Sequence, residues 1–253
     1  MLSLWGRTVL IAGASSGIGA GFARALAAVD AQVVLGARRL DRVTALAAQI
    51  NASGGAALPV ALDVTDEASV AAAYDAAEAR FGTVNSVVAN AGVGTGGRAT
   101  NVPVAGLQQV IDTNLLGTYL VAREGARRMI ASGSQTREDG RIVLVGSITA
   151  QQHGTGDAMY AATKAGLAHL ARQFASEWVR QGINVNTLQP GWIPTEINQE
   201  WFASPRGQAD IAALHRRRLL EPDALDDMLI YLLSDRARQV TGATFTIDDG
   251  QSL

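Results

Sequence analysis

The feature that most constrains the fold of this chain is a glycine-rich turn between an apolar run and a helical pattern. The apolar run covers residues 8–12, the turn carries Gly13, Gly17 and Gly19, and the helical pattern extends to about Val29. Glycines let a backbone approach a pyrophosphate closely, and the amides at the start of the next helix favour its negative charge. Tight turns also need glycine, so the flanking strand and helix are what favour a dinucleotide site. No lysine follows the last glycine, which excludes a P-loop.

Strand and helix patterns alternate along most of the remaining chain. Further strands are predicted at 32–36, 57–62, 86–89, 142–145, 184–188 and 244–248, and helices at about 40–51, 70–81, 104–131, 157–181 and 223–234. This alternation is typical of a doubly wound, Rossmann-like α/β domain, with seven strands in a mostly parallel sheet and helices on both faces. With 253 residues and 48% apolar composition, the chain is expected to form a single domain over 1–253.

Residues 192–220, called here the insertion segment, break this alternation. Trp192, Ile197, Trp201 and Phe202 are interleaved there with polar residues. Apolar and aromatic groups concentrated after a strand end predict a substrate lid. A fixed interface helix is the alternative.

Composition excludes several classes of protein. A net charge of -2 with scattered arginines gives no electrostatic footprint for nucleic acid. No apolar stretch is long enough to span a membrane and the first strand leaves no room for a signal peptide, so the cytoplasm is the expected location. The absence of cysteine excludes disulfides and thiol catalysis. The three histidines, His153, His169 and His215, lie far apart in sequence, so no metal site is expected.

The stretch from Ser147 to Lys164 carries the clearest sign of chemistry. Ser147 follows the apolar strand at 142–145, where open α/β sheets place their ligands. Tyr160 and Lys164 are four residues apart on a predicted helix, so they share one face. An ammonium beside a phenol favours the phenolate and should lower the phenol's pKa from its free value of about 10, which suits proton transfer. Lys164 is also the only lysine among 21 basic residues, although chance could produce this.

The end of the second strand predicts which nucleotide would bind. A carboxylate there would bind a ribose 2′-hydroxyl, but the chain has Ala37 followed by Arg38 and Arg39. Arginines offer bidentate donors suited to a 2′-phosphate, which predicts NADP(H) in preference to NAD(H). The start of a solvated helix is the alternative reading of the two arginines.

Three further polar positions fit a nucleotide-binding sheet edge. Asp63 follows the third strand and could accept a hydrogen bond from an adenine amine, or cap the next helix in competition with Thr65 and Asp66. Asn90 opens a glycine-rich loop of the permissive kind expected beside a cofactor. Asn114 lies among apolar helix residues, where capping or hydrogen bonding in the core could explain it.

In this order along the chain, these motifs resemble the short-chain dehydrogenase/reductase family, and the resemblance covers essentially the whole sequence. The Tyr160-x-x-x-Lys164 pair would be weak evidence alone. It is highly specific when joined to the glycine turn, Asp63, Asn90-Ala91-Gly92, Asn114, Ser147 and Pro190-Gly191.

The resemblance implies a role for each catalytic candidate. Tyr160 would be the general acid/base, and Ser147 would orient the substrate oxygen. Lys164 would bind the nicotinamide ribose and lower the pKa of Tyr160, while Asn114 would hold a water in a proton relay. The implied activity is NADP(H)-dependent interconversion of a ketone or aldehyde with its alcohol, in a homotetramer. The rival is a catalytically silent NADP-binding or scaffold protein on the same fold.

The same resemblance, together with the arguments above, gives the cofactor-binding set. Its members are Gly13, Ser15, Ser16, Gly17, Ile18, Gly19, Arg38, Arg39, Asp63, Val64, Asn90, Ala91, Gly92, Tyr160, Lys164, Pro190, Gly191, Ile193 and Thr195. Three positions depart from the family pattern: Ala12 replaces a usual Thr, Ala89 a usual Asn, and Asp249 a usual Gly. The first two should cost rigidity near the cofactor, and the third should alter packing near a subunit interface.

Overall fold

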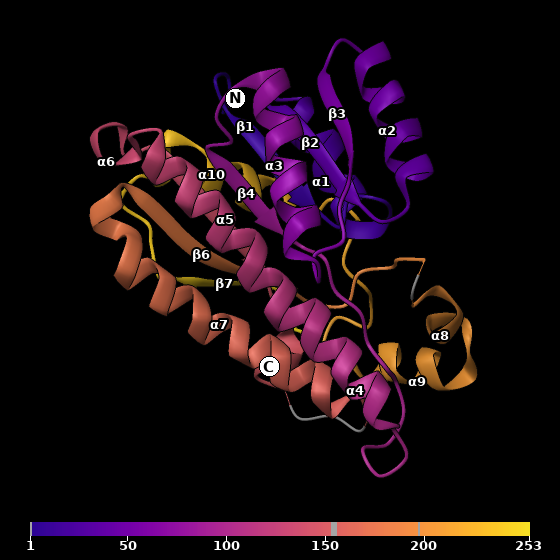
Figure 1. The fold of residues 1–253 in the computed structure, drawn as a ribbon. Helices are drawn as coiled ribbons and strands as arrows, with labels where there is room; N and C mark the ends of the chain where they lie inside the picture. The colour runs from indigo at the N-terminus through magenta and orange to yellow at the C-terminus, as the bar shows by residue number, and fades with distance from the viewer. Residues whose placement is uncertain (1, 153–155, 197) are drawn as a thin grey trace.

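The computed structural model of the chain describes residues 2–152, 156–196 and 198–253. Within them, seven strands form one sheet in the order β3-β2-β1-β4-β5-β6-β7, and every paired strand is parallel (Figure 1). The strands are β1 (Thr8–Ala12), β2 (Gln32–Ala37), β3 (Ala56–Ala61), β4 (Ser86–Ala89), β5 (Gly140–Val145), β6 (Ile183–Pro190) and β7 (Thr244–Ile247). The predicted α/β class is confirmed, and the sheet is wholly rather than mostly parallel.

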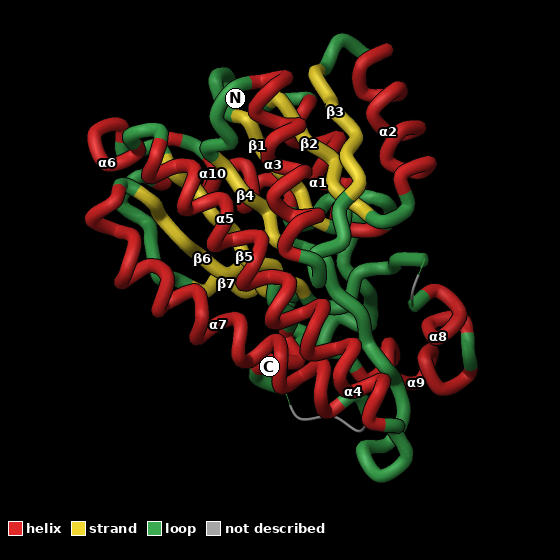
Figure 2. Tube along the Cα trace, in the orientation of Figure 1, coloured by secondary structure: helices red, strands yellow, loops and turns green. Residues whose placement is uncertain are grey.

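Helices cover both faces of this sheet (Figure 2). The helical elements are α1 (Gly17–Ala27), α2 (Leu40–Ala52), α3 (Glu67–Phe81), α4 (Val104–Ile111), η1 (Asp112–Gly117), α5 (Thr118–Ala131), α6 (Ser134–Arg137), η2 (Ile148–Ala150), α7 (Ala158–Trp178), η3 (Val179–Gln181), α8 (Gln199–Ala203), α9 (Pro205–Ala213), α10 (Asp226–Leu233) and η4 (Asp235–Ala237). Core residues of α1, α2 and α10 pack on one face, and those of α3, α5 and α7 pack on the other.

Burial on both faces explains the uninterrupted apolar runs of the strands. Every residue of β1, β4, β5 and β6 is buried, as expected for central strands of a parallel sheet. The strand order reverses between β1 and β4, so the connections after these two strands lead to opposite sides of the sheet. A crevice for ligands is expected at the carboxyl ends of the strands at such a reversal.

The predicted single helix over 104–131 is interrupted. The segment η1 (Asp112–Gly117) is a π-helix between α4 and α5, and it contains the fully buried Asn114. A Cβ on Gly117 would lie 2.6 Å from the Cγ2 atom of Val64, so this turn is packed tightly against the loop between β3 and α3. π-Helical turns inside α-helices are frequent at functional sites.

The insertion segment folds into the two short helices α8 and α9, beyond the carboxyl ends of the strands (Figure 1). The ring of Trp192 packs against that of the buried Phe202, with 5.9 Å between centroids. Ile197 lies outside the described residues. In the described part of the chain, no helix combines the length and the apolar character needed to cross a membrane.

Candidate active site

One large cavity opens at the carboxyl ends of the strands. Its volume is about 1850 Å³, and it is lined by the glycine turn, the ends of several strands, the start of α7, the insertion segment and the C-terminal turn. Pockets for one small ligand measure roughly 300–1,000 Å³. The cavity therefore has room for a dinucleotide and a second molecule.

The glycines of the first turn are required by packing. Gly13 has φ +85°, and a Cβ there would lie 2.8 Å from the Cα of Ala91. A Cβ on Gly19 would lie 2.2 Å from the Gly13 carbonyl oxygen. The Asn90 side chain donates to that same oxygen at 3.1 Å. The turn is thus held tightly against the loop after β4, and Gly13 and Gly17 face the cavity with the bare backbone that a pyrophosphate would approach.

Two departures from the family pattern belong to one structural feature. Ala12 and Ala89 are direct partners in the register between β1 and β4, and both are buried. Two alanines on adjacent strands therefore lie opposite each other where the family usually has Thr and Asn. The backbone N–H of Asn90 also donates to the Ala12 carbonyl at 3.2 Å, so the sheet end keeps a brace from Asn90.

The two arginines after β2 differ in their contacts. The Arg39 guanidinium donates to the hydroxyls of Ser15 and Ser16, each at 2.8 Å, so it lies across the glycine turn. Both arginines are exposed and line the cavity. Arg39 is therefore the better placed of the two to meet a phosphate bound near this turn.

Asp63 does not cap the next helix. Its Oδ1 accepts from the Thr65 backbone N–H at 3.0 Å and from the Thr65 hydroxyl at 2.7 Å. These two bonds, and more weakly the charge of Arg38, hold the pKa of Asp63 below its usual range. Asp66 is the N-cap of α3 and accepts from Ala68 N–H at 2.9 Å. Asp63 lines the cavity, and its contact with adenine stays a prediction.

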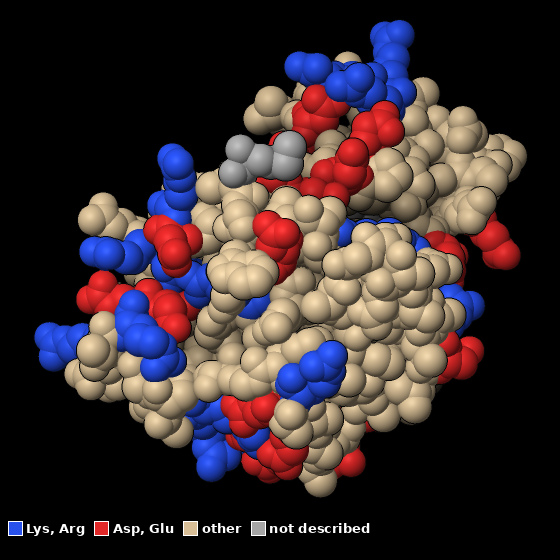
Figure 3. All heavy atoms as spheres, turned by 90° about the horizontal axis from the view of Figure 1, so that it is seen from above, with Lys and Arg blue, Asp and Glu red and all other residues tan. Residues whose placement is uncertain are grey.

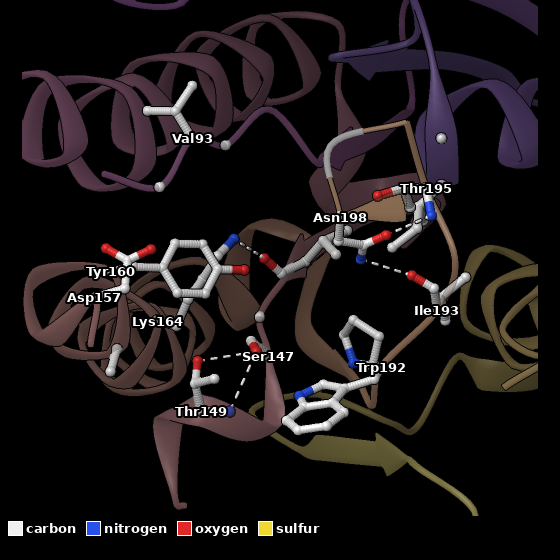
Figure 4. Close-up of a pocket in the computed structure, with 18 of the residues that line it drawn as sticks. Val93, Ser147, Thr149, Asp157, Tyr160, Lys164, Trp192, Ile193, Thr195 and Asn198 are labelled. Carbon is white, nitrogen blue, oxygen red and sulfur yellow. Dashed lines mark hydrogen bonds between the residues drawn. The ribbon is translucent and has the colours of Figure 1, made fainter. Parts of the chain in front are cut away.

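Ser147 and Tyr160 reach the cavity from separate elements. Ser147 lies just after β5, and its Oγ accepts from the backbone N–H of Thr149 at 3.2 Å and from the Thr149 hydroxyl at 2.9 Å (Figure 4). Tyr160 comes from the first turn of α7, and its hydroxyl points into the pocket (Figure 4). Lys164, one turn later, is buried and donates to the Val145 carbonyl at 2.8 Å.

The titration of this group differs from the sequence expectation. Burial raises the pKa of Tyr160; a hydrogen bond with Ser147 opposes this effect and the charge of Asp157 adds to it. Burial lowers the pKa of Lys164 to about 8. The expected lowering of the Tyr160 pKa by Lys164 is wrong for this structure. The ammonium is bonded to the Val145 carbonyl, 5.5 Å from the centre of the phenol ring, and desolvation of the phenol dominates.

Asn114 is hydrogen bonded within the core. Its Oδ1 accepts from Val93 N–H at 2.8 Å, and its Nδ2 donates to the Val93 carbonyl at 2.9 Å and to the Thr163 hydroxyl at 3.3 Å. A Cβ on Gly92 would lie 3.5 Å from both Asn114 Oδ1 and Lys164 Nζ, so these two side chains converge beside the loop. The role of Asn114 in a proton relay stays a prediction.

The turn after β6 is supported by a residue that the sequence did not single out. Asn198 Oδ1 accepts from Thr195 N–H at 2.7 Å, and its Nδ2 donates to the Ile193 carbonyl at 2.9 Å (Figure 4). A Cβ on Gly17 would lie 3.3 Å from the Cγ2 of Thr195, so this turn packs closely beside the glycine turn. The sequence shows an Asn three residues after Thr195, but this spacing alone does not reveal the two hydrogen bonds.

Asp249 lies where the family usually has glycine, and its carboxylate is paired with two arginines. It adopts φ +52°, the left-handed region that favours glycine. Its carboxylate pairs with Arg218 at 2.7 Å and with Arg216 at 3.2 Å. The departure therefore joins the C-terminal turn to the end of the insertion segment.

Almost every predicted site residue lines the one cavity. The exceptions are Gly19 and Asn114, which pack behind its wall. The cavity is also lined by three residues that were not predicted site residues, namely Thr149, Asp157 and Asn198. The described residues contain no group of three or more side chains that could hold a metal ion, and His153 lies outside them. Acidic and basic side chains are interspersed on the face seen in Figure 3.

Comparisons with known proteins agree with this geometry. A family model described as Enoyl-(Acyl carrier protein) reductase matches residues 13–252. The chain is 33% identical to D-threitol dehydrogenase of Mycolicibacterium smegmatis, over 98% of this chain and 94% of that protein.

Two solved structures are also similar. One is a short-chain type dehydrogenase/reductase from Mycobacterium marinum, with TM-score 0.92 and 30% identity over 99% of this chain and 97% of the other. The second is a gluconate 5-dehydrogenase from Burkholderia cenocepacia in complex with NADP and tartrate, with TM-score 0.92 and 31% identity over 99% and 97% of the two chains. The chain belongs to the short-chain dehydrogenase/reductase family.

Proposed function

We propose that this protein is an NADP(H)-dependent oxidoreductase that interconverts a ketone or aldehyde with the corresponding alcohol. The observation that carries the proposal is that one cavity brings together the proton-transfer candidates and the nucleotide-binding turn. Tyr160 and Ser147 line one part of a cavity that also contains the glycine turn with Arg39 across it. A similar protein has been solved with NADP bound, which supports the choice of cofactor.

The residues present fit a dinucleotide. The bare backbone of Gly13 and Gly17 would hold the pyrophosphate, Arg39 with Arg38 the 2′-phosphate, and Lys164 the nicotinamide ribose. When bound, the nicotinamide supplies or accepts the hydride. The protein's own groups bind the substrate oxygen and move its proton.

Hydrogen-bond direction explains how Ser147 would act. A hydroxyl has one donor and two acceptor lone pairs, and Thr149 donates to Ser147 Oγ twice. The Ser147 O–H is therefore left to donate, either to Tyr160 or to a substrate oxygen. Such a donor stabilises the negative charge that develops on the oxygen of a ketone during reduction.

Tyr160 would transfer the proton. During reduction its hydroxyl gives a proton to the nascent alkoxide, and during oxidation its phenolate removes the proton from the alcohol. Because burial raises its pKa, the phenol stays protonated at neutral pH. Reduction should therefore be fast below that pKa and slow as the pH rises through it, and oxidation should show the opposite dependence.

Turnover assays with the wild-type protein and Tyr160→Phe would test this proposal. A panel of ketones, 3-oxoacyl thioesters, sugars and steroids would be assayed with NADPH, and a substrate with a hydrophobic body is expected because of Trp192, Trp201 and Phe202. In the variant, kcat should fall by ~10²–10⁴ while nucleotide binding persists. A scaffold protein would bind NADPH and consume none with any compound.

A further inference from the structure

The loop after β4 is held by side chains from two different elements. Asn114 of η1 binds both backbone groups of Val93, as described above. Asp157, at the start of α7, binds Thr95: its Oδ1 accepts from the Thr95 backbone N–H at 3.2 Å and from the Thr95 hydroxyl at 3.1 Å. The loop is therefore tied to two helices that also carry the catalytic candidates.

Backbone contacts add to this attachment. The Asp157 N–H donates to the Gly97 carbonyl at 3.0 Å. A Cβ on Gly94 would lie 2.3 Å from Asp157 Oδ2, so only glycine at 94 lets the carboxylate close on the loop. Asp157 thus contacts three positions of the loop, at 94, 95 and 97.

The conformation of Asp157 is unusual and fits this role. It has φ +52° and ψ 41°, the left-handed region, immediately before the helix that carries Tyr160. Residues other than glycine rarely adopt this backbone region, although Asp tolerates it better than most. Its hydrogen bonds to the loop compensate for the strained backbone, and its position decides where the first turn of α7 begins.

Residues 94–97 form part of the cavity wall close to Tyr160. Gly94, Gly96, Gly97 and Asp157 all line the cavity. Figure 4 draws Val93, Asp157 and Tyr160 around the same end of the pocket, across from Thr195. The position of this loop therefore sets the space available to a molecule that reaches the Tyr160 hydroxyl. The groups expected to bind the adenosine half, Arg39 and Asp63, lie on other elements.

We infer that Asp157 is a positioning residue that docks residues 94–97 against the first turn of α7 and thereby limits the size of the substrate that reaches Tyr160. The docking is a property of the fold, whereas the effect on substrate size rests on the proposed oxidoreductase function. A carboxylate is suited to this task because its Oδ1 accepts both Thr95 bonds while Oδ2 packs on the bare backbone at Gly94.

Hydrogen exchange tests the docking without any assay of activity. In Asp157→Ala, amides in 93–99 should exchange about tenfold faster than in the wild type, with β5 unchanged. Asp157→Asn keeps the Oδ1 acceptor and should retain most of the protection. Asp41→Ala, an exposed acid on α2, is the matched control and should leave 93–99 unchanged. Unchanged exchange at 93–99 in Asp157→Ala would overturn the docking.

Kinetics test the effect on substrate size. Cyclohexanone and 4-tert-butylcyclohexanone with NADPH form a matched pair of small and large ketones. Asp157→Ala should shift the kcat/KM ratio about tenfold toward the larger ketone, through KM more than kcat, with the NADPH Kd unchanged. An unchanged ratio, in a variant whose loop exchanges faster, would overturn the size limit. If the wild type reduces no ketone, the proposed function fails, while the exchange experiment still decides the docking.

Discussion

Lys164 shows how burial can prepare a single residue for chemistry. The residue is 3% exposed, its ammonium is bonded to the Val145 carbonyl, and desolvation lowers its pKa to about 8. A guanidinium cannot respond in this way, because its pKa stays far above neutral even when buried. The single lysine therefore occupies the position where a titratable, compact cation differs most from the arginine used at every other basic position.

Replacing Lys164 with arginine should separate these properties. The planar guanidinium is wider than an ammonium and cannot take the same place against Val145, so kcat/KM should fall by more than about tenfold. The Lys164 charge is present below about pH 8 and is lost as the pH rises through that value, whereas arginine stays charged. The alkaline limb of the pH profile should therefore move upward in Lys164→Arg.

The matched control is Arg172→Lys on the exposed side of the same helix, which should leave kcat and the pH profile unchanged. A Lys164→Arg variant with wild-type kcat and pH dependence would show that the residue is only a structural cation.

We expect single residues to decide cofactor choice as well. We expect at least about a tenfold preference for NADPH over NADH in kcat/KM, which needs only ~1.4 kcal/mol, and hydrogen bonds to charged groups supply ~1.5–3 kcal/mol. Arg39→Ala and Arg38→Ala should raise the KM for NADPH and barely change that for NADH. The larger effect is expected at Arg39, because it already lies across Ser15 and Ser16. Equal losses with both cofactors would instead indicate structural arginines.

Sequence identified residues whose chemistry depends on their type, and missed those that act through geometry. The glycines, Ser147, Tyr160 and Lys164 could be found because few other residues can do their work. Asn198 could not, because its two bonds to the turn after β6 depend on a backbone shape that the sequence does not reveal.

At the scale of elements, the insertion segment is attached at its two ends. Leu220 N–H donates to the Trp192 carbonyl at 2.9 Å, which closes the segment on itself. Near its start, Glu196 pairs with Arg42 of α2 at 2.6 Å. The helices α8 and α9 lie between these attachments. The segment is therefore a loop with attached ends. Its action as a lid would require α8 and α9 to move over the cavity, and this stays a prediction.

Limited trypsin digestion would show whether α8 and α9 act as a lid. Arg206 lies in the first turn of α9, 5.4 Å from the centre of the Trp201 ring. We expect cleavage at Arg206 in the protein alone and much slower cleavage with NADPH and a substrate analogue bound. Arg206→Gln should remove the cut and identify it. A cleavage rate that does not respond to ligands would favour a fixed interface element.

The π-helical turn η1 interrupts a segment that the sequence predicted to be one helix. The apolar periodicity over 104–131 continues through the π-helical turn, so sequence alone indicated one helix. The interruption follows from a tertiary contact, because Asn114 binds the backbone of Val93 from a different part of the chain. Asn amid apolar residues was the visible sign that something other than helix propensity decided this turn.

At the scale of the molecule, the order of elements and the sheet edge that holds the site followed from the alternation of strands and helices. That alternation did not predict which face of the molecule carries exposed apolar side chains. Exposed apolar side chains remain on α4, η1, α5 and η3, among them Val104 at 79%, Leu116 at 46% and Val179 at 46% exposure. Figure 1 shows α4, α5 and α7 running side by side along one face of the molecule. Such a face favours association with another subunit.

The family resemblance, together with this apolar face, leads us to expect a homotetramer of paired subunits. In it the helical face would pack across one two-fold axis and the C-terminal segment near Ile247 across another. Light scattering should give about four times the chain mass of 26.4 kDa at micromolar concentration. Leu116→Arg places a charge on the helical face and should leave dimers held by the second contact. Trp5→Arg, at a residue that is 85% exposed near the N-terminus, is the control and should keep the tetramer. A monomer mass for the wild-type protein would refute this assembly.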